Sequence, residues 1–248
     1  MHRGLRCGIF LAGVVFCAVA GAVAAEEDSS DIATGERLAA FLRASRTVIS
    51  GHQKLINDAS IGDKHLTGQR IADEALEIFA KGKPAPEDSF DAQDKKLFEA
   101  QLAALREVVD EHQKMIDVKG VGFKGFIPAT FARLVNERFG EKVGDQAKMK
   151  VTAPKELVRN RKALPDQWEQ KVIEEKFLSA DWPKGKPFVE EVPMNGRPSF
   201  RMLIPEYYSA SCLTCHGQPK GEMDISGYPK EGGAEGDLGG AMSITLFK

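Results

Sequence analysis

A pair of cysteines followed directly by a histidine is the feature that most restricts what this chain can be. The segment Ser211–Gly217 reads SCLTCHG, and C-x-x-C-H is the arrangement of covalent haem attachment. Two thiols three positions apart on a helical turn can reach the two vinyl groups along one haem edge. The adjacent histidine then lies under the iron and supplies an axial nitrogen. The pattern occurs once, so the sequence predicts one covalent haem c on Cys212, Cys215 and His216.

The first residues have the layout of a secretory signal peptide. Arg3 and Arg6 give a positive start, and residues 7–25 carry no charge and end in small side chains. We expect cleavage after Ala24 or Ala25, which changes the net charge from −2 to about −4. The competing interpretation is a retained anchor, because an apolar run of 19 residues is near the lower limit for a membrane span.

The predicted organisation is a signal peptide over residues 1–25 and a single domain over residues 26–248, located in the periplasm or outside the cell. No second apolar run of spanning length follows, so no membrane span is expected after cleavage. The mildly acidic net charge provides no basic field, and nucleic acid is not expected as a partner.

Two other chemistries are open to a C-x-x-C pair in an exported chain. Cys7 and Cys17 leave with the signal peptide, so Cys212 and Cys215 have no further cysteine to pair with. A thioredoxin-like redox pair would stand early in a βαβ pattern. A structural zinc site would offer a second close pair of ligands, whereas the histidines here are isolated. The sequence therefore favours haem over both.

Helical patterns dominate the first half of the chain and strand patterns the second. Helices are predicted over residues 35–50, 66–80, 89–116, 129–139 and 164–177, with Asp88 or Ser89 as a cap. Strands are predicted over residues 148–152, 187–192, 199–204 and 238–247, and Asn195 and Gly196 join two of them as a hairpin. We attribute the tripeptide HQK, which occurs at His52 and again at His112, to chance. The pattern predicts an α+β fold with a small antiparallel sheet flanked by helices.

The sixth ligand of the iron is open at the level of sequence. Histidines and methionines could each supply this ligand, although such residues more commonly serve in packing or lie on the surface. Alternatively, the sixth position of the iron is open or holds a water molecule. The candidates of the mature chain are His52, His65, His112, Met115, Met149, Met194, Met202, Met223 and Met242. Candidate cations for the haem propionates, which are more commonly solvated surface residues, are Arg197, Arg201, Lys220 and Lys230.

Four stretches resemble the secreted c-type haem domains with a PAS-like fold, a family known as a domain of unknown function. They are GFKGFIPATFARLVNERF (122–139), KVTAPKELVRNRKALPDQWE (150–169), SCLTCHG (211–217) and EGDLGGAMSIT (235–245). The resemblance implies a haem held against a small antiparallel sheet, with an N-terminal helical region beside it. In the family the distal ligand can be a cysteine on an N-terminal helix. This chain has no mature cysteine there, and His52 lies in the corresponding region, so His52 ranks first among the candidates.

The functional expectation is a redox or gas sensing module that is not an enzyme. The chain ends directly after the last predicted strand, so any signal is expected to pass to a separate signalling protein or redox partner. The alternative is a soluble periplasmic electron carrier. A haem enzyme is the least favoured reading, because the sequence offers no compelling distal acid–base pair.

Overall fold

The computed structural model describes Met1, residues 20–82 and residues 90–248. Residues 2–19, which include most of the predicted signal peptide, lie outside the described residues, as do Asp88 and Ser89. The first described helix begins at Ala20, so the expected cleavage position falls within it. None of the helices in the described ranges is long and apolar enough to cross a membrane.

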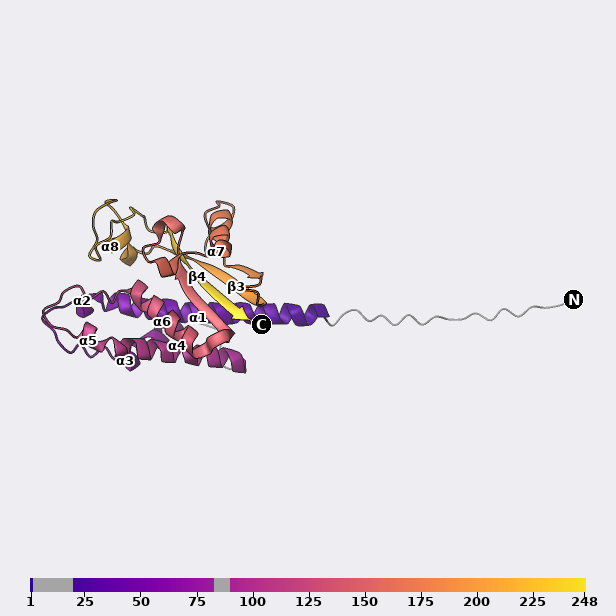
Figure 1. The fold of residues 1–248 in the computed structure, drawn as a ribbon, viewed down its shortest axis with the longest axis horizontal. Helices are drawn as coiled ribbons and strands as arrows, with labels where there is room; N and C mark the ends of the chain where they lie inside the picture. The colour runs from indigo at the N-terminus through magenta and orange to yellow at the C-terminus, as the bar shows by residue number, and fades with distance from the viewer. Residues whose placement is uncertain (2–19, 83–89) are drawn as a thin grey trace.

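Helices make up the N-terminal part of the described chain (Figure 1). They are α1 (Ala20–Gly51), α2 (Gln53–Ile56), α3 (Gly68–Lys81), α4 (Ala92–Glu111), α5 (Gln113–Ile116) and α6 (Pro128–Val143). The cap of α4 is Asp91, whose side chain accepts a hydrogen bond from the amide of Asp94. The expected cap at position 88 or 89 was therefore placed two to three residues too early.

The second half forms the sheet and a few short helical segments. The helical segments are η2 (Gly144–Gln146), η3 (Lys155–Leu157), η4 (Arg161–Ala163), α7 (Gln167–Val172), η5 (Ile173–Phe177), η6 (Ala210–Cys212) and α8 (Leu213–His216). The strands are β1 (Ala147–Thr152), β2 (Phe188–Glu191), β3 (Ser199–Tyr207) and β4 (Leu238–Phe247).

All neighbouring strands of the sheet are antiparallel, in the order β1-β4-β3-β2. The hairpin at Asn195 and Gly196 is confirmed by the bridge between Met194 and Arg197. The α+β class, the small antiparallel sheet and the N-terminal helical region are therefore confirmed.

Each face of the sheet packs on a different apolar layer. Phe200, Met202 and Ile204 of β3 belong to the large core that also contains side chains of α1, α3, α4 and α6. Leu203 points to the other face, where it joins Val172 and Ile173 of the α7–η5 segment in a smaller cluster. This alternation along β3 follows from the two-residue period of a strand. Figure 1 shows α7 above the sheet and α1 below it.

The helical half contains an internal repeat, so the recurrence of HQK is not a coincidence. Sixty positions separate His52 from His112, and the same spacing relates α2 to α5 and the start of α3 to the start of α6. His65 and Gly125, also sixty positions apart, both have positive φ angles, of 54° and 71°. Within residues 52–64, six residues recur unchanged sixty positions later: His52, Gln53, Lys54, Ile56, Gly62 and Lys64.

The two copies hold each other through reciprocal hydrogen bonds. The amide of Lys64 donates to Oδ1 of Asp117 at 3.0 Å, and the amide of Lys124 donates to Oδ1 of Asn57 at 3.1 Å. In the same way, Nε2 of Gln113 donates to the Leu66 carbonyl, and its counterpart on Gln53 donates to Phe126. The sequence signal was weak because only scattered positions are identical, whereas the shared geometry is unambiguous.

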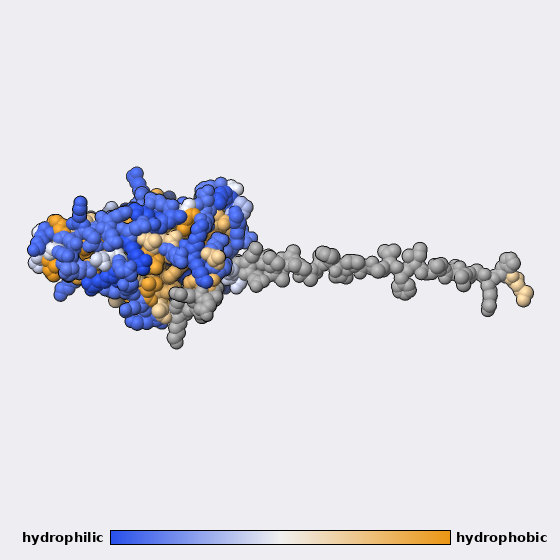
Figure 2. Space-filling model, turned by 90° about the horizontal axis from the view of Figure 1, so that it is seen from below, coloured by the Kyte–Doolittle hydropathy of each residue, from blue (hydrophilic) through white to orange (hydrophobic). Residues whose placement is uncertain are grey.

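The loops of the repeat lie at one end of the molecule, where they expose apolar side chains. Ile61, Val118 and Val121 are each more than one-third exposed. Figure 2 shows apolar colour at that end of an otherwise mostly hydrophilic surface.

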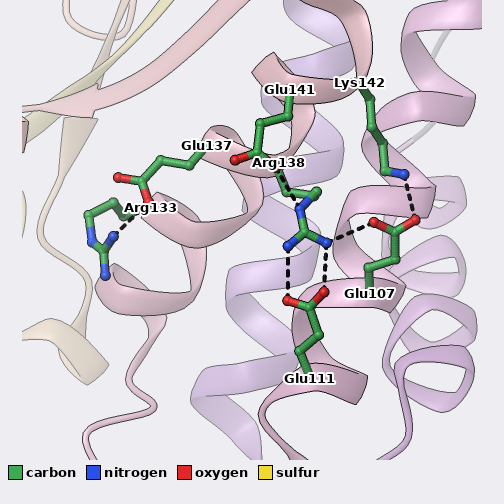
Figure 3. Close-up of polar contacts among 7 residues, drawn as sticks. All are labelled: Glu107, Glu111, Arg133, Glu137, Arg138, Glu141 and Lys142. Carbon is green, nitrogen blue, oxygen red and sulfur yellow. Dashed lines mark hydrogen bonds and ion pairs between the residues drawn. The ribbon is translucent and has the colours of Figure 1, made fainter.

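An ion network joins α4 to α6 near the middle of the repeat (Figure 3). Arg138 donates to Glu107 and to both carboxylate oxygens of Glu111, and it also contacts Glu141. Lys142 contacts Glu107 as well. Hydrogen bonds from Lys142 and Arg138 lower the pKa of Glu107, and the hydrogen bonds from Arg138 lower the pKa of Glu111.

The reciprocal hydrogen bonds predict equal costs for two substitutions sixty positions apart. Asn57→Ala and Asp117→Ala each leave one buried amide without its acceptor, and each should lower the free energy of unfolding by about 1–2 kcal/mol. Urea denaturation measures this directly. Lys54→Ala, at an exposed position of α2, is the control and should change stability by less than about 0.5 kcal/mol. If only one of the two loop variants loses stability, the repeat is not energetically reciprocal.

The α4–α6 network predicts a pH-dependent stability difference. The pKa values of Glu107 and Glu111 lie below their ordinary value of 4.5 in the folded chain. The stabilisation is therefore complete above that value and is lost as the pH falls through the lower folded-state pKa. Arg138→Met should be less stable than the unaltered chain at pH 7, and the difference should shrink towards pH 3 and in 1 M salt. A difference that stays constant across this range would contradict the assignment.

Candidate functional site

Strand β3 leads directly into the segment that carries the two cysteines. The pairing of β3 with β4 has a bulge between Glu206 and Tyr207, and bulges redirect the chain at the edge of a ladder. The chain then enters η6 and α8, with Cys212 as the N-cap of α8 in αR geometry. Cys212 and Cys215 therefore lie three residues apart along one helical turn, which places them on the same side.

Both cysteines are free thiols and both are half-buried. Sγ of Cys212 lies 3.4 Å from the hydroxyl of Ser209. Burial raises the pKa of Cys215, and the nearby carboxylate of Asp224 raises it further. Neither sulfur is in a disulfide and both come from one turn, as attachment to a single cofactor edge requires.

His216 is held on two sides, and its Nε2 forms no hydrogen bond with any of the described residues. Its ring stacks on that of Tyr208, with centroids 5.1 Å apart and an interplanar angle of 18°. Nδ1 lies 2.8 Å from Oε2 of Glu231. Since an ionised carboxylate only accepts hydrogen bonds, Nδ1 is assigned as the donor, and Nε2 carries the lone pair. Nε2 is therefore the nitrogen available to a metal.

Tyr208 is fixed by the glycine-rich chain that surrounds it. Its amide donates to the carbonyl of Asp237 and its carbonyl accepts from the amide of Gly236. A Cβ at Gly239 would lie 2.3 Å from the Tyr208 ring, so only glycine allows this approach. The Tyr208 hydroxyl is buried and has no hydrogen-bond partner within the part of the chain that the structure describes, and burial raises the pKa of Tyr208 to about 12.

Arg159 ties the histidine, the cysteine turn and the following loop together. Its Nε and Nη2 contact the two carboxylate oxygens of Glu231 at 2.7 and 2.9 Å. Nη1 donates to Asp224 at 2.6 Å, and Nη2 also donates to the Cys215 carbonyl at 2.9 Å. Bidentate pairs of this kind fix orientation as well as charge.

The carboxylates of this cluster are ionised. Burial alone would raise the pKa of Glu231, but hydrogen bonds from Arg159 and His216 outweigh it and hold the pKa below its ordinary range. The pKa of Asp224 is likewise lowered against the effect of burial, by hydrogen bonds from Ser226, Arg159 and the amide of Tyr228. The cluster therefore places negative charge behind His216 and a balancing guanidinium behind that charge.

These residues fit a covalent haem in their donor chemistry. Two free thiols share a helical turn, and the adjacent histidine keeps Nε2 free because Nδ1 is engaged. The Tyr208 hydroxyl is a buried polar atom beside His216 that still lacks a partner. Cys212 and Cys215 would hold the porphyrin edge and His216 would face the iron.

No group of three or more His, Cys, Asp or Glu side chains suited to a metal ion occurs within the described ranges.

His52 lies on the helical half, between the end of α1 and the start of α2. It follows the last residue of α1, and its Nε2 lies 2.6 Å from Oε2 of Glu74 on α3. Arg43 and Arg46 of α1 contact Glu206 at the end of β3. His52 follows Arg43 by nine positions, which at 3.6 residues per turn places it on about the opposite side of the helix axis. No hydrogen bond joins His52 to Cys212, Cys215 or His216 among the described residues, and its role as the distal ligand stays a prediction.

The other candidate ligands have structural surroundings of several kinds. Met149, Met202 and Met242 are buried in the core, and Met115 packs against it. His112 contacts the Val108 carbonyl of its own helix through Nδ1, and His65 is exposed beside Asp63. Met194 lies in the β2–β3 hairpin. Met223 is exposed on the loop that follows the cysteines.

The candidate cations divide into two groups. Arg197 contacts Asp145 and the Phe247 ring, and Arg201 contacts Asp166 and Trp168, so both are engaged elsewhere on the sheet. Lys220 and Lys230 lie on the loop after the cysteines, and Lys230 is near Glu222.

Sequence reasoning missed Tyr208, Arg159 and Glu231. Arg159 lay inside one of the stretches quoted for the family resemblance, which was the one available signal. The pairing of Glu231 with His216 spans fifteen residues of irregular loop, and no periodic pattern predicts such a contact.

Comparison with known proteins gives one match. A family model described as Tll0287-like (Tll0287) matches residues 85–246. This range contains β1, β2, β3, β4 up to Leu246, the cysteine turn and all residues of the cluster around His216. Comparison with curated proteins and with solved structures found no match.

Proposed function

The chain belongs to the Tll0287-like family, and from that premise we propose that it is an exported mono-haem c-type cytochrome-like protein. Its proposed role is to respond to redox state or to bind a small gas, without an enzymatic step of its own. The matched family resembles the PAS-like haem domains to which the sequence pointed. The finer assignment rests on the chemistry of Cys212, Cys215 and His216.

The observation that carries the proposal is the hydrogen bond between His216 and Glu231. Because Nδ1 is engaged by the carboxylate, Nε2 is the nitrogen left to serve as a ligand. A histidine that served only to pack or to form a surface ion pair would not need to follow a C-x-x-C turn directly. The free thiols on that turn support the same reading.

Attachment through the cysteines is an addition reaction that needs no oxidant. Each thiol adds across one vinyl group: the sulfur bonds to the carbon next to the ring, and the thiol hydrogen ends on the terminal carbon. Two thioethers form, and no electrons are gained or lost overall. When bound, the haem would supply a one-electron couple and an axial position for a ligand. The chain's own residues hold it and tune its surroundings.

The proposed location outside the cytoplasm rests on the N-terminal sequence pattern. Arg3 and Arg6, followed by the uncharged run 7–25, are typical of a signal peptide. Covalent attachment also suits that setting, because a cofactor held only by affinity would be lost to dilution there.

Absorption spectroscopy of cysteine variants tests the cofactor. The full-length chain, expressed with a c-type haem attachment system, should retain haem after denaturation in alkaline pyridine. Cys212→Ala and Cys215→Ala should each show the shifted spectrum of a single thioether, and the double variant should lose covalent haem. Ser211→Ala, an exposed neighbour, is the matched control. Full-length protein that carries no covalent haem would overturn the proposal.

The same preparations separate the sensing role from the alternative of an electron carrier. Reduced protein that binds CO or NO supports a gas-binding module. A six-coordinate iron that ignores both gases and exchanges electrons rapidly with a donor protein would favour the carrier instead.

The predicted ligand role of His52 has its own test. To reach iron, Nε2 of His52 has to exchange Glu74 for the metal. His52→Ala should therefore convert a low-spin spectrum to high-spin while haem content is unchanged. Glu74→Ala, which removes the competing acceptor but leaves the ring, should retain the low-spin signal. An unchanged spectrum in His52→Ala would end the assignment.

A further inference from the structure

We propose that Glu231 is a positioning residue that lowers the redox potential of the site through Nδ1 of His216, and that Arg159 limits this effect. The inference rests on the proposed function, because it takes His216 as the axial ligand. It assigns a role to two residues outside the attachment motif.

The first step is the contact itself. Nδ1 of His216 lies 2.8 Å from a carboxylate oxygen of Glu231. A partner on the remote nitrogen fixes the orientation of a ligating imidazole and raises its basicity. A carboxylate does so more strongly than a neutral acceptor, because a hydrogen bond to an ionised group is shorter and stronger. A more basic ligand favours the more positive, oxidised iron, so the potential falls.

The second step is the shielding of this contact. Glu231 has about one-fifth of its side chain exposed and Arg159 about the same. The ring of Tyr208 covers one face of His216. With limited access of water, a charge near the ligand acts more strongly than the same charge on an exposed surface.

The third step is the counter-charge. Arg159 forms a bidentate pair with Glu231, so both carboxylate oxygens are held and part of their negative charge is balanced. Asp224, which is fully buried as a side chain, takes a third bond from the same guanidinium. The charge that His216 experiences is therefore the balance between Glu231 and Arg159.

Two exposed side chains outside the cluster provide matched controls. Glu222 is about half exposed and Lys162 is about two-thirds exposed. Neither side chain has a hydrogen bond to His216 among the described residues. Replacing them changes the total charge by the same amount as replacing Glu231 or Arg159, without touching the ligand's hydrogen bond.

The test is a spectroelectrochemical titration of full-length haem-loaded protein at one pH and ionic strength. Glu231→Gln keeps an acceptor oxygen but removes the charge. It should raise the midpoint potential by at least the 59 mV that corresponds to a tenfold change in a one-electron equilibrium. Arg159→Gln should shift the potential in the opposite direction. Glu222→Gln and Lys162→Gln should each give much smaller shifts.

Each outcome has one meaning. If Glu231→Gln shifts the potential no more than Glu222→Gln, or lowers it, the inference is overturned while the haem assignment stands. If Glu231→Gln does not fold, Arg159→Gln decides: a shift no larger than that of Lys162→Gln, or an upward shift, overturns the inference. Full-length protein without covalent haem removes both this inference and the proposed function.

Discussion

The position of α8 depends on the guanidinium of Arg159, because the cysteine turn has no apolar layer beneath it. Within the described chain, no residue from Ser209 to Asp237 belongs to either apolar cluster. One side chain instead contacts Glu231, Asp224 and the carbonyl of Cys215. Loss of one partner from such a buried ionic cluster typically costs about 3–5 kcal/mol, because the remaining charges lose their compensation. The local structure around His216 is therefore held together by ionic contacts, whereas most of the fold is held together by apolar packing.

The sheet supplies the rigid frame to which this ionic cluster is attached. Strand β3 is paired on both sides and buried on both faces along most of its length. Its end is held by Glu206, which contacts Arg43 and Arg46 of α1. Tyr208 follows two residues later and stacks on His216. The end of the buried strand β3 thus fixes Tyr208, and Tyr208 orients the ring of His216. The loop from β3 to β4 folds around the histidine.

Features encoded by neighbouring residues could be predicted from the sequence, and features that join distant segments could not. Strand β4 has the predicted bounds, and the hairpin at Asn195 and Gly196 is present, because alternation and turn residues are local signals. The grouping of Cys212, Cys215 and His216 could be predicted from their spacing alone. Arg159 and Glu231 are brought together by the path of the chain around the sheet edge, and each alone reads as an ordinary surface charge. The reciprocal loops of the repeat were missed for the same reason, since their contacts cross between copies.

The contacts around His216 and those around His52 come from different parts of the chain. The residues around His216 are Tyr208, Glu231 and Arg159, which all lie within the family match. The helical half approaches the site through α1, whose Arg43 and Arg46 face Glu206 while His52 faces Glu74. His52 and His112 occupy equivalent positions in the repeat, so packing of the two copies already accounts for a histidine there. The cluster around His216 can therefore be altered without changing the contacts between the two copies of the repeat, because the two sets of contacts share no residue.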